Sequence, residues 1–157
     1  MDIPSNLRTQ WISQARLLLD SYQSLLRRDL IARSGDPDDD AQRLWTAPFV
    51  ALSHGTEADP ILNFANRTTL QLWEMPLEKL IAMPSRLTAE PMVQSKRQKF
   101  LEQTAKQGFI TGYDGVRISS TGRRFLIQNA TIWNLTKSNG QAAGQAATFE
   151  KWTFISC

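Results

Sequence analysis

The first stretch of the chain repeats apolar side chains at intervals of three and four, with polar side chains between them. This spacing places the apolar positions on one face of an α-helix, where they can pack against a core. Ser5 or Asn6 is suited to cap such a helix and Gly35 bounds it, so we predict an amphipathic helix that ends near Arg33. The apolar stripe comprises Leu7, Trp11, Ala15, Leu18, Tyr22, Leu25 and Leu26.

A second pattern changes from strand to helix at Asn66. Residues 60–65 read Pro-Ile-Leu-Asn-Phe-Ala, which is typical of a strand, whereas Leu70 and Trp73 recur at helical spacing. The Asn66 side-chain oxygen can accept from the free amides of the first helical turn, so Asn66 is the expected N-cap. Pro76 ends this helix and suits the first turn of a second short helix, which we expect to end at residue 82.

Turn-forming residues divide the rest of the chain. Residues 34–40 form a turn-rich acidic linker. Thr121-Gly122 and Asn139-Gly140 separate runs of β-forming residues, and the second pair is a strong hairpin signal. We therefore predict a helical turn over residues 41–45, a strand over 48–53, a helix over 92–107, and strands over 113–119, 123–135 and 142–154.

The predicted strand over residues 123–135 is apolar on both faces. Strict alternation along this strand places Phe125, Ile127, Asn129, Thr131, Trp133 and Leu135 on one face. One face can then cover the domain core. The other can receive the N-terminal helix or a second subunit.

Several short segments of this sequence resemble those of a known family. The run Leu62-Asn63-Phe64-Ala65, which feeds a short helix, resembles the Asn-x-Ala segment of PAS sensor domains. Together with Leu52-Ser53-His54-Gly55-Thr56-Glu57 and Pro84-Ser85-Arg86-Leu87-Thr88-Ala89-Glu90-Pro91, it resembles the MEKHLA family. That family has short stand-alone bacterial members, which this chain resembles, and plant members fused behind homeodomain and leucine-zipper segments. No such segment accompanies these residues, so a role in transcription is not implied.

The order of elements and the resemblance predict an α+β fold. We expect a PAS-like five-stranded antiparallel sheet with short helices on one face, plus an N-terminal amphipathic helix. The domain boundaries follow as an N-terminal helix over residues 1–35, a linker with a helical turn over 36–46, and a PAS-like MEKHLA domain over 47–157. A cone-shaped fold of the nuclear-transport-factor type is the competing prediction, but it places its helices before most of the sheet.

Charge is divided unevenly along the chain. Residues 1–90 hold nine basic and twelve acidic side chains, and residues 91–157 hold nine basic and three acidic. One predicted helix carries four basic side chains and is suited to an acidic partner, nucleic acid or phosphate. These are Lys96, Arg97, Lys99 and Lys106. The segment is short and lacks interleaved aromatic side chains, so we interpret it as a solvated helix face and do not expect a nucleic-acid partner.

The lone cysteine, Cys157, excludes an internal disulfide and suits a reducing cytoplasm. The chain begins without a basic and apolar leader, and it lacks a run of the ~20 apolar residues that a membrane span requires. We therefore expect a cytoplasmic protein. PAS domains that use a flavin photochemically place a cysteine on the helix after the second strand, so the resemblance implies no covalent flavin here. A metal is not expected either.

The densest polar segment surrounds the only histidine, His54. Glu57 or Asp59 is placed to orient His54 for acid–base chemistry. Ser53 is adjacent in sequence and points to the opposite strand face, so it cannot serve as the nucleophile. An enzyme that uses His54 is therefore the outsider among the possible functions, and a polar turn is the simpler interpretation of this segment.

The PAS resemblance implies a ligand cavity beneath the sheet. We predict that it draws its lining from His54, Asn66, Trp73, Arg86, Glu90, Phe100, Arg117, Asn129, Trp133 and Gln145. The aromatic members can equally be core residues, and Arg86 can simply pair with Glu90. The preferred function is a sensory or regulatory domain that binds an unidentified small molecule non-covalently and signals through protein contacts. The alternative is a ligand-free dimerisation or partner-binding module.

Overall fold

A computed structural model describes residues 3, 5–88, 102 and 106–155. Helices come first, then two short strands, then short helices and finally the long strands. In chain order the elements are η1 (Ser5–Leu7), α1 (Arg8–Leu26), α2 (Pro37–Trp45), β1 (Val50–His54), β2 (Leu62–Ala65), α3 (Arg67–Trp73), α4 (Leu77–Leu80), η2 (Ser85–Thr88), β3 (Phe109–Ile118), β4 (Arg124–Thr136), β5 (Ala142–Phe149) and β6 (Lys151–Phe154).

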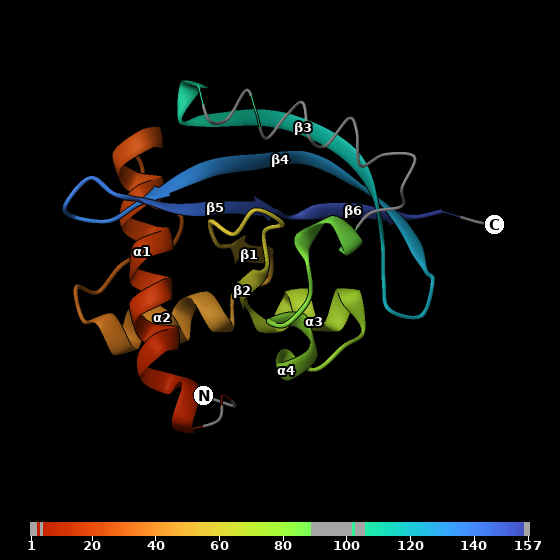
Figure 1. Ribbon diagram of the computed structural model, residues 1–157, viewed down its shortest axis with the longest axis horizontal. Coiled ribbons are helices and arrows are strands. Elements are labelled where there is room, and N and C mark those ends of the chain that lie inside the picture. Colours follow the sequence, from red (N-terminus) through yellow and green to blue (C-terminus); the bar gives the residue numbers. More distant parts are fainter. Residues whose placement is uncertain (1–2, 4, 89–101, 103–105, 156–157) are drawn as a thin grey trace.

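The strands of the described chain form one antiparallel sheet in the order β2-β1-β5-β4-β3, and β6 also pairs with β4. The five-strand path and the N-terminal helix confirm the predicted fold class. One predicted strand, over residues 142–154, is divided at Glu150 into β5 and β6. These two pieces pair with successive parts of β4, and β6 continues the line of β5 (Figure 1).

Each face of the sheet is covered by its own set of helices. On one face, α3 and α4 pack Trp73 and Leu80 against Val50, Leu52 and Phe125. On the other, α1 and α2 bring a second apolar cluster that comprises Trp11, Ala15, Leu18, Leu19, Tyr22, Leu44 and Trp45. The predicted stripe of the first helix is therefore its buried face.

The N-terminal helix is tied to the outer sheet face by aromatic contacts. Trp11 stacks on Phe64 with ring centroids 4.0 Å apart, and Tyr22 meets the edge of Trp133 at 5.0 Å. The Trp133 indole also donates to the Leu18 carbonyl at 3.2 Å. In this chain the face that was expected to receive a helix or a second subunit is covered by its own α1.

The predicted division of β4 into two faces is wrong beyond Ile127. Phe125 and Ile127 belong to the cluster under α3, whereas Trp133 and Leu135 belong to the cluster under α1. Asn129 causes the change, because its φ of 56° places it in the left-handed region and the β3–β4 register shifts there. A bulge adds one residue, so every later side chain moves to the opposite face.

The predicted end of the first helix and the extent of the linker are also wrong. The helix α1 ends at Leu26, where Arg27 adopts a left-handed conformation, and not near Arg33. Residues 37–40 form the first turn of α2 instead of a linker. Pro37 suits the first helical position, and three aspartates in that turn interact favourably with the helix dipole.

Buried Asp40 explains why the segment between α1 and α2 is ordered as it is. Its side chain is 3% exposed, and its carboxylate accepts from the Ser34 backbone at 2.7 Å and from the Ser34 hydroxyl at 3.0 Å. Arg33 adds a contact of 3.4 Å and also pairs with Asp20 of α1 at 2.8 Å. Burial alone raises the pKa of Asp40, but these bonds outweigh it and hold the pKa below its ordinary value.

Candidate ligand cavity between the sheet and the short helices

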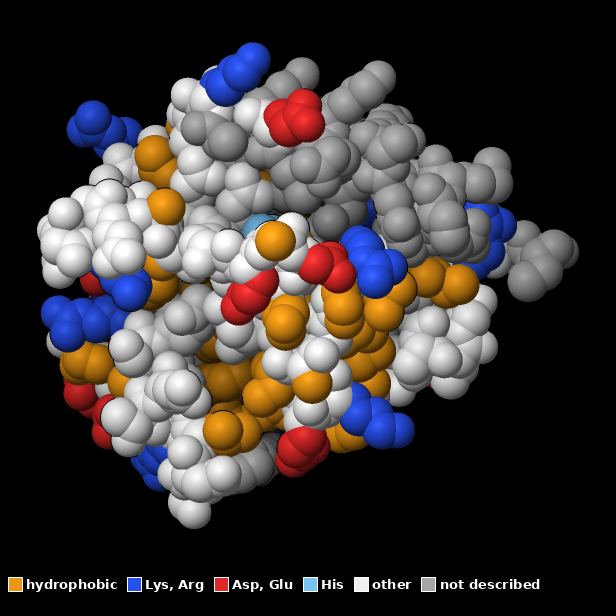
Figure 2. Space-filling model, in the orientation of Figure 1, with side chains coloured by type: hydrophobic (Ala, Val, Ile, Leu, Met, Phe, Trp, Pro, Cys, Tyr) orange, Lys and Arg blue, Asp and Glu red, His pale blue; other side chains and the backbone are white. Residues whose placement is uncertain are grey.

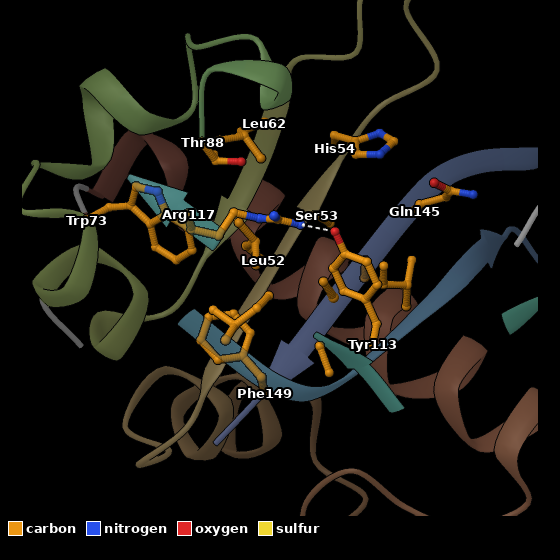
Figure 3. A pocket seen from close by; sticks show the side chains of 15 residues that line it. Leu52, Ser53, His54, Leu62, Trp73, Thr88, Tyr113, Arg117, Gln145 and Phe149 are labelled. Carbon is orange, nitrogen blue, oxygen red and sulfur yellow. Dashed lines mark hydrogen bonds between the residues drawn. The ribbon is translucent and has the colours of Figure 1, made fainter. Parts of the chain in front are cut away.

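A cavity of about 60 Å³ lies between the sheet and α3. Its apolar walls include Leu52, Leu62, Trp73, Ile127, Ile132 and Phe149, and its polar lining includes His54, Thr88, Tyr113, Arg117 and Gln145. Figure 3 shows these side chains converging from β1, β3, β5 and the short helices. Because one water takes about 30 Å³ of liquid volume, this space corresponds to roughly two waters.

Arg117 is the charged group of this cavity. It lies on β3, is 6% exposed, and donates to the Tyr113 hydroxyl at 3.3 Å and to the Val116 carbonyl at 2.9 Å. The guanidinium also lies 5.4 Å from the centre of the Tyr113 ring. Gly115 permits this arrangement, because a Cβ there would lie 2.7 Å from the Tyr113 hydroxyl. Figure 3 shows Arg117 extending toward Tyr113 across the site.

His54 stands at the end of β1 and is 9% exposed. Its Nδ1 lies 2.9 Å from the Gly55 carbonyl, which can only accept, so Nδ1 carries the proton in this contact. The Glu57 carboxylate accepts from the Ile61 backbone at 3.1 Å. That bond is the main reason why the pKa of Glu57 is lowered. Asp59 is engaged with Arg86 at 3.2 Å.

The geometry around His54 does not assemble a hydrolytic site. The Ser53 hydroxyl donates to Asn63 at 2.6 Å and accepts from Gln14 of α1 at 3.2 Å, so Ser53 faces α1. This arrangement matches the predicted separation of Ser53 from His54. Within the described residues, no group of three or more His, Cys, Asp or Glu side chains is arranged to hold a metal ion.

The wall formed by Trp73 is fixed by the residue that follows it. Glu74 caps α3 in a left-handed conformation, and its carboxylate accepts from the Ser119 hydroxyl at 2.8 Å and from the Thr121 hydroxyl. The bond from Thr121, followed by that from Ser119, lowers the pKa of Glu74. The Ser120 amide donates to the Trp73 carbonyl at 3.0 Å. The end of α3 is thereby joined to the turn between β3 and β4.

The cavity brings together four of the predicted site residues, namely His54, Trp73, Arg117 and Gln145. Gln145 donates to the Asn134 side chain at 2.9 Å. Sequence reasoning missed Tyr113 and Thr88 as lining residues. Tyr113, two positions from Gly115 and four from Arg117 on a predicted strand, shares their face, and this spacing was the available signal.

Four other predicted residues lie elsewhere. Asn66 is fully buried but caps α3, Trp133 packs under α1, and Arg86 is exposed on η2 in a pair with Asp59. Asn129 belongs to a separate polar cleft of about 230 Å³ that Arg28 and Lys151 also line. The remaining two, Glu90 and Phe100, lie outside the described residues, as does most of the predicted helix over residues 92–107.

Comparison with known families and structures agrees with this architecture. The sequence model of the MEKHLA domain family matches residues 12–154 of this chain. The chain belongs to the MEKHLA family. The homeobox-leucine zipper protein ATHB-9 of Arabidopsis thaliana is 27% identical over 119 residues, which are 73% of this chain and 14% of that protein. The MEKHLA chain thus spans about a seventh of that relative's length.

Solved PAS structures share the fold of this MEKHLA chain. A PAS domain from Colwellia psychrerythraea has a TM-score of 0.63 at 14% identity, covering 74% of this chain and 94% of its own. A light-oxygen-voltage domain studied with a flavin analogue has a TM-score of 0.57 at 17% identity, covering 74% and 84%. The PAS domain of a LuxR-family regulator from Burkholderia thailandensis, in complex with ethanol, has a TM-score of 0.54 at 14% identity, covering 74% and 96%.

The cavity does not fit a flavin. A cavity of about 150 Å³ holds a single benzene ring, so about 60 Å³ is far too small for a three-ring flavin, and the Trp73 ring occupies one wall. Trp73 itself is held edge-on against Phe125 with centroids 5.0 Å apart. The enclosed space is that of a few non-hydrogen atoms at most.

The surface beside the cavity is partly apolar. Figure 2 shows hydrophobic side chains gathered over the region of α3 and α4, with charged side chains scattered around them. Leu87 of η2 is 46% exposed in this neighbourhood of the fold. None of the helices in the described part of the chain combines the length and apolar character needed to cross a bilayer.

Proposed function

We propose that this MEKHLA domain is a sensory or regulatory module that binds a small, non-covalent ligand in the cavity and signals through protein contacts. The observation that carries the proposal is a cavity with apolar walls and a buried Arg117 at the position enclosed by the sheet and α3. Apolar walls with a few polar groups are typical of small-molecule sites. The PAS domain complexed with ethanol is a structural neighbour whose ligand is similarly small.

Neighbouring residues of the sheet link the cavity to the outer helix. Ile132 lines the cavity, while Trp133, the next residue of β4, packs under α1. Ala146 of β5 contributes to both, since it lines the cavity and belongs to the cluster under α1. A ligand that shifts β4 or β5 therefore moves the surface on which α1 rests, which supplies a physical route for a signal.

A second candidate function is a partner-binding or dimerisation module without a ligand. The apolar side chains gathered over α3 and α4 favour it, because such surfaces often mark protein contacts (Figure 2). In either case we place the protein in the cytoplasm, where its single cysteine stays reduced.

Native mass spectrometry of freshly purified protein, with an absorption spectrum of the same sample, tests the proposal. The sensor function predicts a reproducible added mass that is released on denaturation. Ala130→Leu fills the cavity and should remove that mass, whereas Ala142→Leu on the exposed start of β5 should keep it. A clean apo mass in all three proteins would reject ligand binding, and a dimer mass would favour the second function.

A further inference from the structure

The buried charge in the cavity has no counter-charge within the described part of the chain. Arg117 is 6% exposed, and no carboxylate of the described residues forms an ion pair with it. The described lining of the cavity also contains no Asp or Glu. A guanidinium stays charged even when buried, so a desolvated arginine without an anion is costly.

The hydrogen bonds that Arg117 makes leave donor capacity unused. The guanidinium has five N–H donors, and the described residues provide the Tyr113 hydroxyl and the Val116 carbonyl as acceptors. A second buried donor lines the same cavity, because the Trp73 indole N–H has no acceptor among the described residues and Trp73 is 2% exposed. The Trp73 N–H can take any acceptor, as can the indole N–H groups of Trp11 and Trp45 elsewhere, which are likewise unpartnered among the described residues. The demand for a negative charge at this site therefore comes from Arg117.

We infer that the cavity takes a short-chain monocarboxylate, with its carboxylate on Arg117 and its alkyl chain against the apolar walls. This inference rests on the proposed ligand-binding function and names the chemical class of the ligand. Arginine suits a carboxylate because its planar donors match both oxygens. Leu52, Ile127 and Phe149 supply the apolar surface for the chain.

Cavity volume limits the chain length. The enclosed volume, roughly that of two waters, favours the shortest acids, so the affinity should not rise from acetate to butyrate. Inorganic phosphate carries the charge but leaves the apolar walls without a contact. A primary alcohol fills the apolar walls but leaves Arg117 without an anion.

Isothermal titration calorimetry in a buffer free of carboxylate and phosphate tests the inference. The probes are acetate, propionate and butyrate, with propionamide as the neutral isostere of propionate, 1-propanol and inorganic phosphate. We expect propionate to bind about ten- to hundredfold more tightly than propionamide, the range of a charge-assisted hydrogen bond. Equal affinities, or a preference for phosphate, would overturn the inference.

Two variants test whether Arg117 is the residue that binds the carboxylate. Arg117→Met keeps a long side chain and should lower propionate affinity by about the same ten- to hundredfold, to the level of propionamide. Arg67→Met removes an exposed charge from α3 and should leave the affinity within twofold. The isostere comparison in the natural protein stands even where Arg117→Met does not fold. Unchanged propionate binding by a folded Arg117→Met would overturn the role of Arg117.

The outcomes also separate this inference from the proposed function. Binding of 1-propanol or propionamide at least as tight as propionate would leave a ligand-binding domain and reject the carboxylate. Failure of every probe, with a clean apo mass, would reject both. A co-purified small molecule that is not an acid would keep the sensor function and again reject the carboxylate.

Discussion

Replacing Asn66 should be among the most destabilising single changes in this chain. The side chain is fully buried and makes five hydrogen bonds to described residues. Its oxygen accepts from the Ala51 amide and from the amide and hydroxyl of Thr69, and its amide donates to the carbonyls of Leu44 and Phe49. One residue thus joins α2, β1 and α3.

The magnitude follows from what Asn66→Ala leaves behind. Loss of the helix cap costs about 1 kcal/mol. Each buried carbonyl that loses its donor costs about 1–3 kcal/mol. The Leu44 carbonyl falls at the low end because it still accepts from Ala47 at 3.3 Å. We expect a total loss of about 3–5 kcal/mol, a large part of the roughly 5–15 kcal/mol that stabilises an ordinary domain.

Urea unfolding, followed by the fluorescence of the five tryptophans, measures this loss. The urea concentration at the unfolding midpoint should fall, while the dependence of the unfolding free energy on urea should stay the same. Asn66→Asp keeps the cap acceptor but sets a carboxylate oxygen against two carbonyls, so it should be at least as damaging as alanine at neutral pH. Asn6→Ala, at an exposed asparagine that does not cap α1 because the N-cap position is Leu7, should change stability by no more than about 0.5 kcal/mol. A loss below about 1 kcal/mol for Asn66→Ala would refute the reasoning.

Two further changes test the packing of the sheet and the order of the loop before α2. Gly144→Ala should cost at least about 2 kcal/mol, because φ is 117° there and a Cβ would lie 1.9 Å from the His54 carbonyl oxygen. Gly122→Ala, with φ of 85° and open space, should cost about 1 kcal/mol, and equal losses in urea unfolding would contradict the steric argument. Asp40→Asn should lower stability by about 1–3 kcal/mol at neutral pH. The pKa of Asp40 is lower in the folded than in the unfolded protein, so the extra stability of the wild type over Asp40→Asn is complete above the unfolded pKa and is lost as pH falls through the folded pKa. A stability difference that stays constant from pH 6 to pH 3 would contradict this role of Asp40.

Local patterns in the sequence were enough for several elements. Asn66 caps α3 as predicted, because capping needs only a suitable side chain three residues before a free amide. The Asn139-Gly140 turn joins β4 to β5, since Gly140 adopts the positive φ that the turn requires. The stripe from Trp11 to Tyr22 was readable because helical spacing and burial coincide. The MEKHLA resemblance supplied the fold class, a PAS-like antiparallel sheet with short helices on one face.

Tertiary structure decided how these elements meet. The left-handed Asn129 exchanges the faces of β4, and a single such residue leaves no periodic trace before the partner strand is in place. Trp133 therefore packs under α1 and not in the cavity. Arg117 and His54 converge because β1 and β3 lie over one core, although 63 positions separate them in the chain. Such a meeting depends on strand order and register, which no local pattern contains.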